Sequence, residues 1–183
     1  MATRIPGDFI RGVRLFENLT HDEVQQLLDA AEEVEFAEGQ PVFHEGKKKR
    51  ALYVVIEGKV RITLAAPSIA ETELTTVEPQ GVFGESSFFH QSLHHATAYC
   101  LTDVRLIRLR RSKYRELLKE GNLAAYKLAA NAADILGERL QQTDEWIEKL
   151  LHARQDKELI VHWQKFRRGI SGGFSAPITG FTP

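Results

Sequence analysis

Cysteine is nearly absent from this sequence. Its 183 residues include only one, Cys100, so no intramolecular disulfide can form and a secreted, disulfide-stabilised scaffold is excluded. No apolar run approaches the roughly 20 residues that a membrane-spanning helix needs, and residues 1–8 lack the apolar centre of a signal peptide. The formal net charge of −1 gives no overall attraction to nucleic acid or to an anionic membrane. We therefore expect a soluble cytoplasmic protein with no membrane partner.

Motifs of the common enzyme classes are also missing. The chain has no phosphate-binding P-loop, no nucleophile elbow, no His-Glu-x-x-His motif and no dinucleotide fingerprint. His90, His94 and His95 follow Glu85 in the sequence and could be weighed as metal ligands. However, the chain contains no His-x-His pair, and adjacent histidines on a strand point to opposite faces. We expect neither an enzyme nor a metal site.

The residues that are present form three stretches. The first is helical, because apolar residues recur at helical spacing and Thr20 with Glu23 forms a capping box that opens a helix at about Thr20–Ala31. The second, Val34–Leu109, contains short alternating segments separated by glycine and proline turns. Within it, Leu52–Ile56 is continuously apolar, which is typical of a strand covered on both faces. Several strands without helices between them predict a closed all-β roll.

The third stretch is helical again. Ser112 is a candidate N-cap for a short helix through Leu118, and Gly121 is its stop signal. Asn122 is the candidate N-cap of a long, proline-free helix over about 122–152. A helix of about 30 residues is about 45 Å long, which exceeds what a compact roll can cover. Part of its apolar stripe therefore needs a partner, and a second copy of the chain, giving a homodimer, is the simplest one.

Four motifs in this order resemble one known family. They are Leu15-Phe16-(x2)-Leu19, Phe36-(x2)-Gly39-(x2)-Val42-Phe43-(x)-Glu45-Gly46, Leu52-Tyr53-Val54-Val55-Ile56-Glu57-Gly58 and Gly81-Val82-Phe83-Gly84-Glu85. The match covers about residues 15–152 and is similar to the cyclic-nucleotide-binding domain of the catabolite-activator (Crp-Fnr) type. This resemblance implies a mainly β fold, a double-stranded β-helix or jelly roll, with an N-terminal helix and a long C-terminal dimerisation helix. We expect this domain over 1–153 and an appendage over 154–183.

The segment Phe83-Gly84-Glu85-Ser86-Ser87 is the predicted ligand site. Glycine lets a backbone approach a ligand closely, and a helical turn that begins at Glu85 would present unpaired N–H groups and two serine hydroxyls to a phosphate. In the family this segment holds the phosphate of a cyclic nucleotide, cyclic AMP or cyclic GMP, and its glutamate binds the ribose 2′-hydroxyl. The resemblance implies that role for Glu85. The alternative is that Gly84 only makes a tight turn and Glu85 pairs with a nearby cation.

The following residues depart from the family pattern. Members that bind cyclic nucleotides carry an arginine just before a small-small-Thr strand start, whereas this chain reads Leu93-His94-His95-Ala96-Thr97. His94 thus takes the arginine position, with His95 and Thr97 as further candidate ligand contacts. Arginine offers a permanently charged two-pronged fork, which histidine lacks. Losing that fork is expected to cost about two decades in affinity for the phosphate.

Two residues of the long helix complete the predicted site. Thr143 falls where a hydroxyl contacts the purine in members of the family, so the resemblance implies that contact here. Asp144 replaces a small hydroxyl residue and would either repel the ligand or select a different base. The alternative is that Thr143 is an ordinary residue of the helix surface.

The C-terminal appendage has its own pattern. Residues 156–166 form one more amphipathic helix, whose apolar face carries Leu159, Ile160, Trp163 and Phe166. The tail over 174–183 holds isolated apolar residues among Gly, Ser, Pro and Thr, and it is too short for a helix-turn-helix. We therefore expect no direct DNA binding by this chain. The helix and tail fit a docking segment for a protein partner, and the alternative is a disordered end.

Together these observations predict a non-catalytic, homodimeric sensor. A small anion, foremost cyclic AMP or cyclic GMP, would settle between Glu85 and the long helix and shift the helix arrangement. One alternative is a ligand-independent adaptor that docks a protein through its C-terminal helix and tail, and another is a truncated Crp-type transcription regulator. His94 favours the adaptor, whereas Glu85 and Thr143 favour the sensor. The basic turn Lys47-Lys48-Lys49-Arg50 is either a solvated loop or a docking patch for an acidic partner or nucleic acid.

Overall fold

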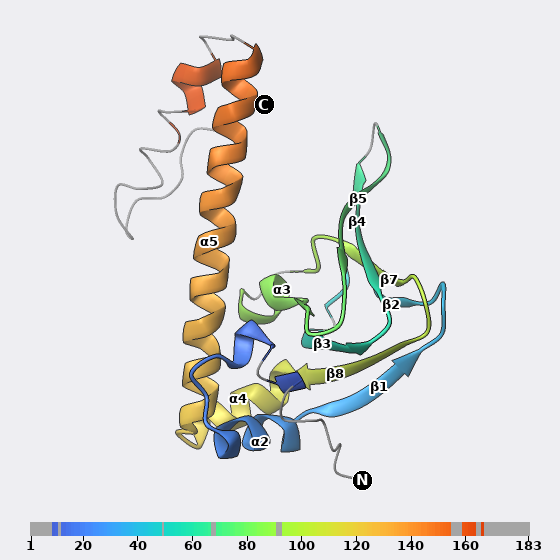
Figure 1. The fold of residues 1–183 in the computed structure, drawn as a ribbon, viewed down its shortest axis with the longest axis vertical. Coiled ribbons are helices and arrows are strands. Elements are labelled where there is room, and N and C mark those ends of the chain that lie inside the picture. Colours follow the sequence, from blue (N-terminus) through green and yellow to red (C-terminus); the bar gives the residue numbers. More distant parts are fainter. Residues whose placement is uncertain are drawn as a thin grey trace. The chain divides into compact units, whose positions relative to one another are not determined.

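The computed structural model describes residues 9–10, 12–48, 50–66, 69–90, 93–154, 159–163 and 166. Within these ranges the chain forms two four-stranded antiparallel sheets with helices before and after them (Figure 1). It divides into two compact units, Met1–Asp134 and Ile135–Pro183. Both sheets lie in the first unit, which confirms the predicted mainly β roll with flanking helices.

The first sheet has the strand order β1-β8-β3-β6. Its strands are β1 (Glu32–Phe36), β8 (Val104–Arg110), β3 (Ala51–Glu57) and β6 (Val82–Phe83). The central strand β3 is buried at every position except its last. Tyr53 and Val55 join the roll core, while Leu52 and Val54 line an apolar pocket with Leu27 from the N-terminal helix. The prediction of a strand covered on both faces is confirmed.

The second sheet has the order β2-β7-β4-β5. Its strands are β2 (Pro41–Phe43), β7 (Thr97–Cys100), β4 (Val60–Ala66) and β5 (Ile69–Val77). Inward residues of both sheets form one apolar cluster, which includes Val60, Ala98 and Leu106. Cys100 is buried in the same cluster, as expected of a small apolar residue. Burial, with a smaller effect of Asp103, raises the pKa of its thiol to about 11, so this thiol is unreactive at neutral pH.

Short helices precede and interrupt the strands. They are the 3-10 helix η1 (Arg14–Phe16), α2 (His21–Asp29) and α3 (Glu85–Phe89). The predicted capping box opens α2: the amide of Glu23 donates to Thr20 Oγ1 at 3.2 Å, and the amide of Thr20 donates to Glu23 Oε2 at 2.8 Å. This helix covers the outer face of the first sheet (Figure 1).

Two helices follow the roll, α4 (Arg111–Lys119) and α5 (Leu123–Arg154). The prediction of Ser112 as the cap of α4 is wrong, because β8 runs straight into the helix and Arg110 occupies the N-cap without a side-chain bond. Gly121 ends this part in the left-handed conformation, with φ of 71°. Asn122 caps α5, since its Oδ1 accepts the amide of Ala125 at 3.2 Å. The last two predictions are confirmed.

Parts of the predicted appendage lie outside the described residues. Residues 159–163 are helical, whereas the tail over 174–183 and part of the amphipathic segment 156–166 are not among those described. Lys49 of the basic turn is also outside them. Across the described part of the chain, no helix combines the length and apolar character needed to cross a bilayer.

Candidate functional site

The predicted ligand segment lies where β6 turns into α3. Gly84 forms this turn with φ of 83°, a left-handed conformation that side chains other than glycine rarely adopt. A Cβ atom at this position would lie 2.6 Å from the carbonyl oxygen of Ala51 on β3. Glycine is therefore required here for two reasons, and it holds the start of α3 close to the first sheet.

The three residues after this glycine differ in exposure. Glu85 is the first residue of α3 and is half-buried, whereas Ser86 is exposed. Ser87 is buried on the inner side of the helix, at 3% exposure. Its hydroxyl donates to the carbonyl oxygen of Gly84 at 3.2 Å. The segment thus has an outward edge, Glu85 and Ser86, and an inward group, Ser87.

His94, at the position of the family's arginine, lies inside the protein. Its side chain is 4% exposed, and Nδ1 lies 2.9 Å from Ser87 Oγ. Because the Ser87 hydroxyl carries one proton and donates to Gly84, it can accept a hydrogen bond from Nδ1–H of His94. The two groups that the resemblance assigns to the phosphate are therefore brought together, and they bind each other.

The imidazole of His94 also stacks on an aromatic ring. Its centroid lies 3.8 Å from that of Phe43, with 9° between the ring planes. Phe43 in turn contacts Tyr53 and Phe83, each at 5.9 Å between centroids, and the last two rings stack at 5.0 Å. Four rings thus form a cluster inside the roll beside α3. This contact was not expected from the sequence, in which Phe43 stands only within a motif of the family.

The turn after β2 closes over the same region. The amide of Gly46 donates to the His94 carbonyl at 2.8 Å, and the amide of His94 donates to the Lys47 carbonyl at 3.1 Å. The amide of Glu45 donates to Thr97 Oγ1 at 3.1 Å, so the hydroxyl of Thr97, which is 9% exposed, accepts a backbone bond. The main chain of the predicted basic turn is therefore tied to the candidate site.

Three further residues of the predicted site are His95, Thr143 and Asp144. His95 is exposed while its neighbour His94 is buried, so the two rings lie on opposite sides of the chain. Thr143 and Asp144 belong to the second unit, where the Thr143 hydroxyl donates to the carbonyl of Arg139 at 2.8 Å. Their part in a ligand site stays a prediction. Among the described residues, no cluster of three or more His, Cys, Asp or Glu could hold a metal ion.

Aromatic packing anchors α3 to the helices that follow the roll. Phe88 is fully buried and contacts the rings of Phe89 and Tyr114 at 4.8 and 5.1 Å between centroids. The Arg111 guanidinium donates to the carbonyl of Phe89 at 3.1 Å, and burial followed by Arg50 and Arg115 lowers its pKa. The Tyr114 hydroxyl donates to the carbonyl of Ala125, in the first turn of α5. Direct contacts therefore connect the candidate site to the long helix.

A two-sheet roll with a short helix between β6 and β7 and a long helix after β8 is the architecture of catabolite-activator-type domains. Three comparisons agree. The curated cyclic AMP receptor protein of Thermus thermophilus is 32% identical over 135 residues, which is 74% of this chain. The crystal structure of the Thermus thermophilus catabolite activator protein matches with a TM-score of 0.68 and 30% identity over 75% of this chain and 62% of that one. The N-terminal domain of a Streptomyces coelicolor transcriptional regulator matches with a TM-score of 0.64 and 31% identity over 76% of this chain and 95% of that one.

The model of the cyclic nucleotide-binding domain family matches residues 33–121, which include the candidate site. The chain belongs to this family, within its Crp-like members. It spans 61% of the length of the curated Thermus protein.

Proposed function

We propose that the chain is a non-catalytic sensor whose α3 segment binds a small anion, with a cyclic nucleotide as the leading ligand. One observation carries this proposal: the polar groups expected at a phosphate converge at a single point. Ser87 Oγ lies 2.9 Å from His94 Nδ1 and 3.2 Å from the Gly84 carbonyl, in an otherwise apolar and aromatic interior. A few convergent polar groups in apolar surroundings are typical of small-molecule sites.

The residues fit the two halves of a cyclic nucleotide unequally. Glu85 is half-buried at the start of α3, where it would accept a hydrogen bond from the ribose hydroxyl, and Ser86 is exposed beside it. At the phosphate, His94 offers no guanidinium fork, and its Nδ1 is already bonded to Ser87. A ligand phosphate would have to replace that internal bond, so we expect weaker binding than in family members with the arginine.

The contacts around α3 supply a route for the signal. A ligand that moves α3 would move Phe88 against Tyr114, and Tyr114 is bonded to the first turn of α5. A ligand shifts the balance between two arrangements of these helices only to the extent that it binds the two with different affinity.

The signal would pass along α5. We propose that the chain forms a homodimer through this helix. Leu140, Trp146 and Leu150 are 56%, 61% and 41% exposed in the single chain. Large apolar residues exposed along one helix are typical of an interaction face. The C-terminal segment would then bind the partner protein that reads the signal.

A ligand-independent adaptor is the second candidate, because the internal Ser87–His94 bond also favours it. In that case His94 fills the phosphate position with a side chain of the protein itself, and the roll acts as a rigid scaffold. A Crp-type transcription regulator remains a further proposal, which concerns a protein longer than the matched region.

Isothermal titration with cyclic AMP and cyclic GMP near pH 6 and pH 8 tests the sensor. We expect binding that is stronger at the lower pH, because a protonated imidazole supplies the positive charge that the missing arginine would have provided. Glu85→Ala should abolish this binding. His94→Arg should strengthen it by about two decades, since the fork is restored.

His95→Arg is the matched control, because it adds the same charge at the exposed neighbouring position. It should leave the affinity for nucleotide unchanged. If the parent chain gives no heat at millimolar nucleotide while His94→Arg binds, the sensor is rejected and the adaptor is supported.

A further inference from the structure

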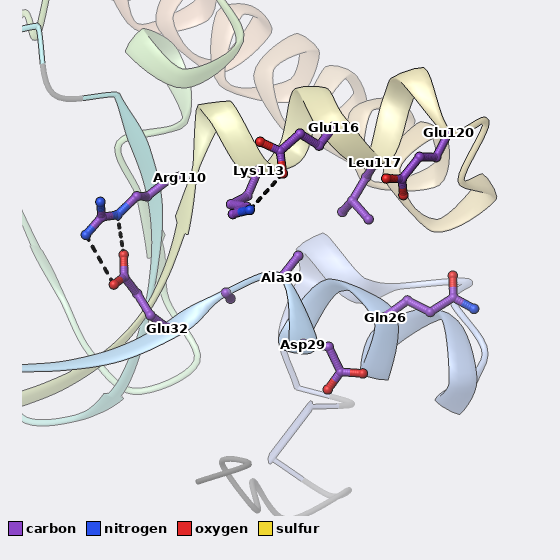
Figure 2. Close-up of a pocket in the computed structure, with 10 residues that line it drawn as sticks. Gln26, Asp29, Ala30, Glu32, Arg110, Lys113, Glu116, Leu117 and Glu120 are labelled. Carbon is purple, nitrogen blue, oxygen red and sulfur yellow. Dashed lines mark hydrogen bonds and ion pairs between the residues drawn. The ribbon is translucent and has the colours of Figure 1, made fainter.

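A concave site lies between α2 and α4 and includes no residue of α3 (Figure 2). This groove has a volume of about 580 Å³, within the range of ligand and peptide pockets. Gln26 and Asp29 of α2 form one wall, and α4 forms the other with Lys113, Glu116 and Glu120. We call it the α2–α4 groove.

The groove combines an apolar floor with a pair of carboxylates. Ala30 and Leu117 lie between its two walls (Figure 2), so a small aliphatic group could be buried there. Asp29 lies on the α2 wall and Glu120 on the α4 wall, one on either side of this floor. A ligand that spans the groove would therefore meet an acidic group at both edges and apolar surface between them.

The two cationic side chains of the groove each pair with a carboxylate of its lining, although Glu32 is shared with Arg108. The Arg110 guanidinium forms a fork with the carboxylate of Glu32 at one end, and Lys113 Nζ donates to Glu116 Oε2 at 2.8 Å. In the part of the chain that the structure describes, Asp29 and Glu120 take part in no ion pair. Asp29 accepts one neutral hydrogen bond, from Gln25 Nε2 at 2.7 Å. Four carboxylates line the groove, those of Asp29, Glu32, Glu116 and Glu120, against two cationic side chains, Arg110 and Lys113, so its lining carries a net negative charge.

We propose that the α2–α4 groove docks a segment of a partner protein in which a small aliphatic residue is flanked by lysine or arginine. The aliphatic side chain would bind against Ala30 and Leu117, and the two basic side chains would pair with Asp29 and Glu120. Charge complementarity at the edges of an interface adds specificity and speeds association. The proposal is independent of nucleotide binding, because none of these residues belongs to the α3 site.

Selection of random short peptides displayed on phage against the full chain tests the proposal. We expect enrichment of sequences with Lys or Arg on both sides of an aliphatic residue. A labelled synthetic copy of an enriched peptide should then lose about tenfold affinity, measured by fluorescence anisotropy, for the isosteric double variant Asp29→Asn/Glu120→Gln. Raised salt should weaken binding to the parent in the same assay, because exposed charge pairs are screened.

Glu38→Gln is the matched control, since it removes an exposed carboxylate from a separate turn. It should leave peptide affinity unchanged, and circular dichroism should show that the double variant stays folded. No enrichment, enriched peptides without basic residues, or equal affinity for the double variant would each overturn the proposal. A change in the oligomeric state of the double variant by sedimentation would identify a second copy of the chain as the occupant and would also overturn it.

Discussion

The α3 site and the α2–α4 groove hold their polar side chains in opposite ways. Ser87 and His94 are buried and bonded to each other, whereas Asp29 and Glu120 face an open groove without an ion pair in the described part of the chain. A buried polar group that loses its partner costs about 1–3 kcal/mol, while an exposed one is satisfied by water. The polar groups of the α3 site therefore stabilise the fold, whereas those of the groove are exposed and accessible to a binding partner.

The largest expected effect concerns the anchor of the α3 site. Phe88 is fully buried against Phe89 and Tyr114, so Phe88→Ala should lower the free energy of unfolding by about 3–5 kcal/mol. Urea denaturation measures this loss. Leu74→Ala is the control, because Leu74 is 55% exposed and its truncation should change stability by less than about 0.5 kcal/mol. Similar losses in both variants would contradict a buried anchor.

Gly84 gives the next largest effect. Gly84→Ala places a side chain at φ of 83° and 2.6 Å from the Ala51 carbonyl, and the conformation alone costs about 1–2 kcal/mol. Gly39→Ala isolates that conformational part, because Gly39 has φ of 77° and nothing within 4 Å of an added Cβ. The unfolding free energy should fall further in Gly84→Ala than in Gly39→Ala. Equal losses would show that the approach of α3 to β3 is not tight.

The sequence predicts much of the α3 site and little of the α2–α4 groove. The series of short strands separated by turns, the capping box at Thr20 and the tight turn at Gly84 follow from local residue patterns, and the structure agrees. The burial of His94 does not follow from its neighbours, because it depends on Phe43 and on the main chain of Lys47, which the fold brings from a different strand and turn. The groove is likewise tertiary, since α2 and α4 are separated by the whole roll.

The bond between Ser87 and His94 should contribute a moderate amount of stability. A double-mutant cycle with Ser87→Ala and His94→Phe isolates it, because phenylalanine keeps the ring that stacks on Phe43 but lacks Nδ1. We expect a coupling free energy of about 1 kcal/mol from urea denaturation of the four proteins. Additive effects of the two substitutions would mean that the pair is not bonded in solution.

A smaller effect is expected at the end of the groove, where Glu32 pairs with Arg108 and Arg110. Hydrogen bonding from Arg108, and then from Arg110, lowers the pKa of Glu32 below its ordinary value of 4.5, against the effect of burial. A lowered pKa in the folded state adds stability above the unfolded value, and this stability is lost as the pH falls through the folded value. Since the Glu32 side chain is 38% exposed, the contribution should stay below about 1 kcal/mol.

The matching measurement compares the parent with Glu32→Gln by urea denaturation at neutral and acidic pH. The variant should be less stable at neutral pH, and the difference should shrink once the pH is well below 4.5. A difference that is independent of pH would show that packing of the side chain, rather than its charge, is what matters.

The smallest effect is expected from the two carboxylates that the groove leaves without an ion pair. Asp29→Asn/Glu120→Gln should change the free energy of unfolding by less than about 0.5 kcal/mol, because both groups are exposed and no ion pair of the described residues is lost. Urea denaturation at low and high salt measures this. The double variant could instead be destabilised as strongly as a variant that breaks the Ser87–His94 pair. These carboxylates would then have a structural role, and the contrast between the internally bonded α3 site and the open groove would fail. Unchanged stability together with lost peptide binding would assign their role to recognition.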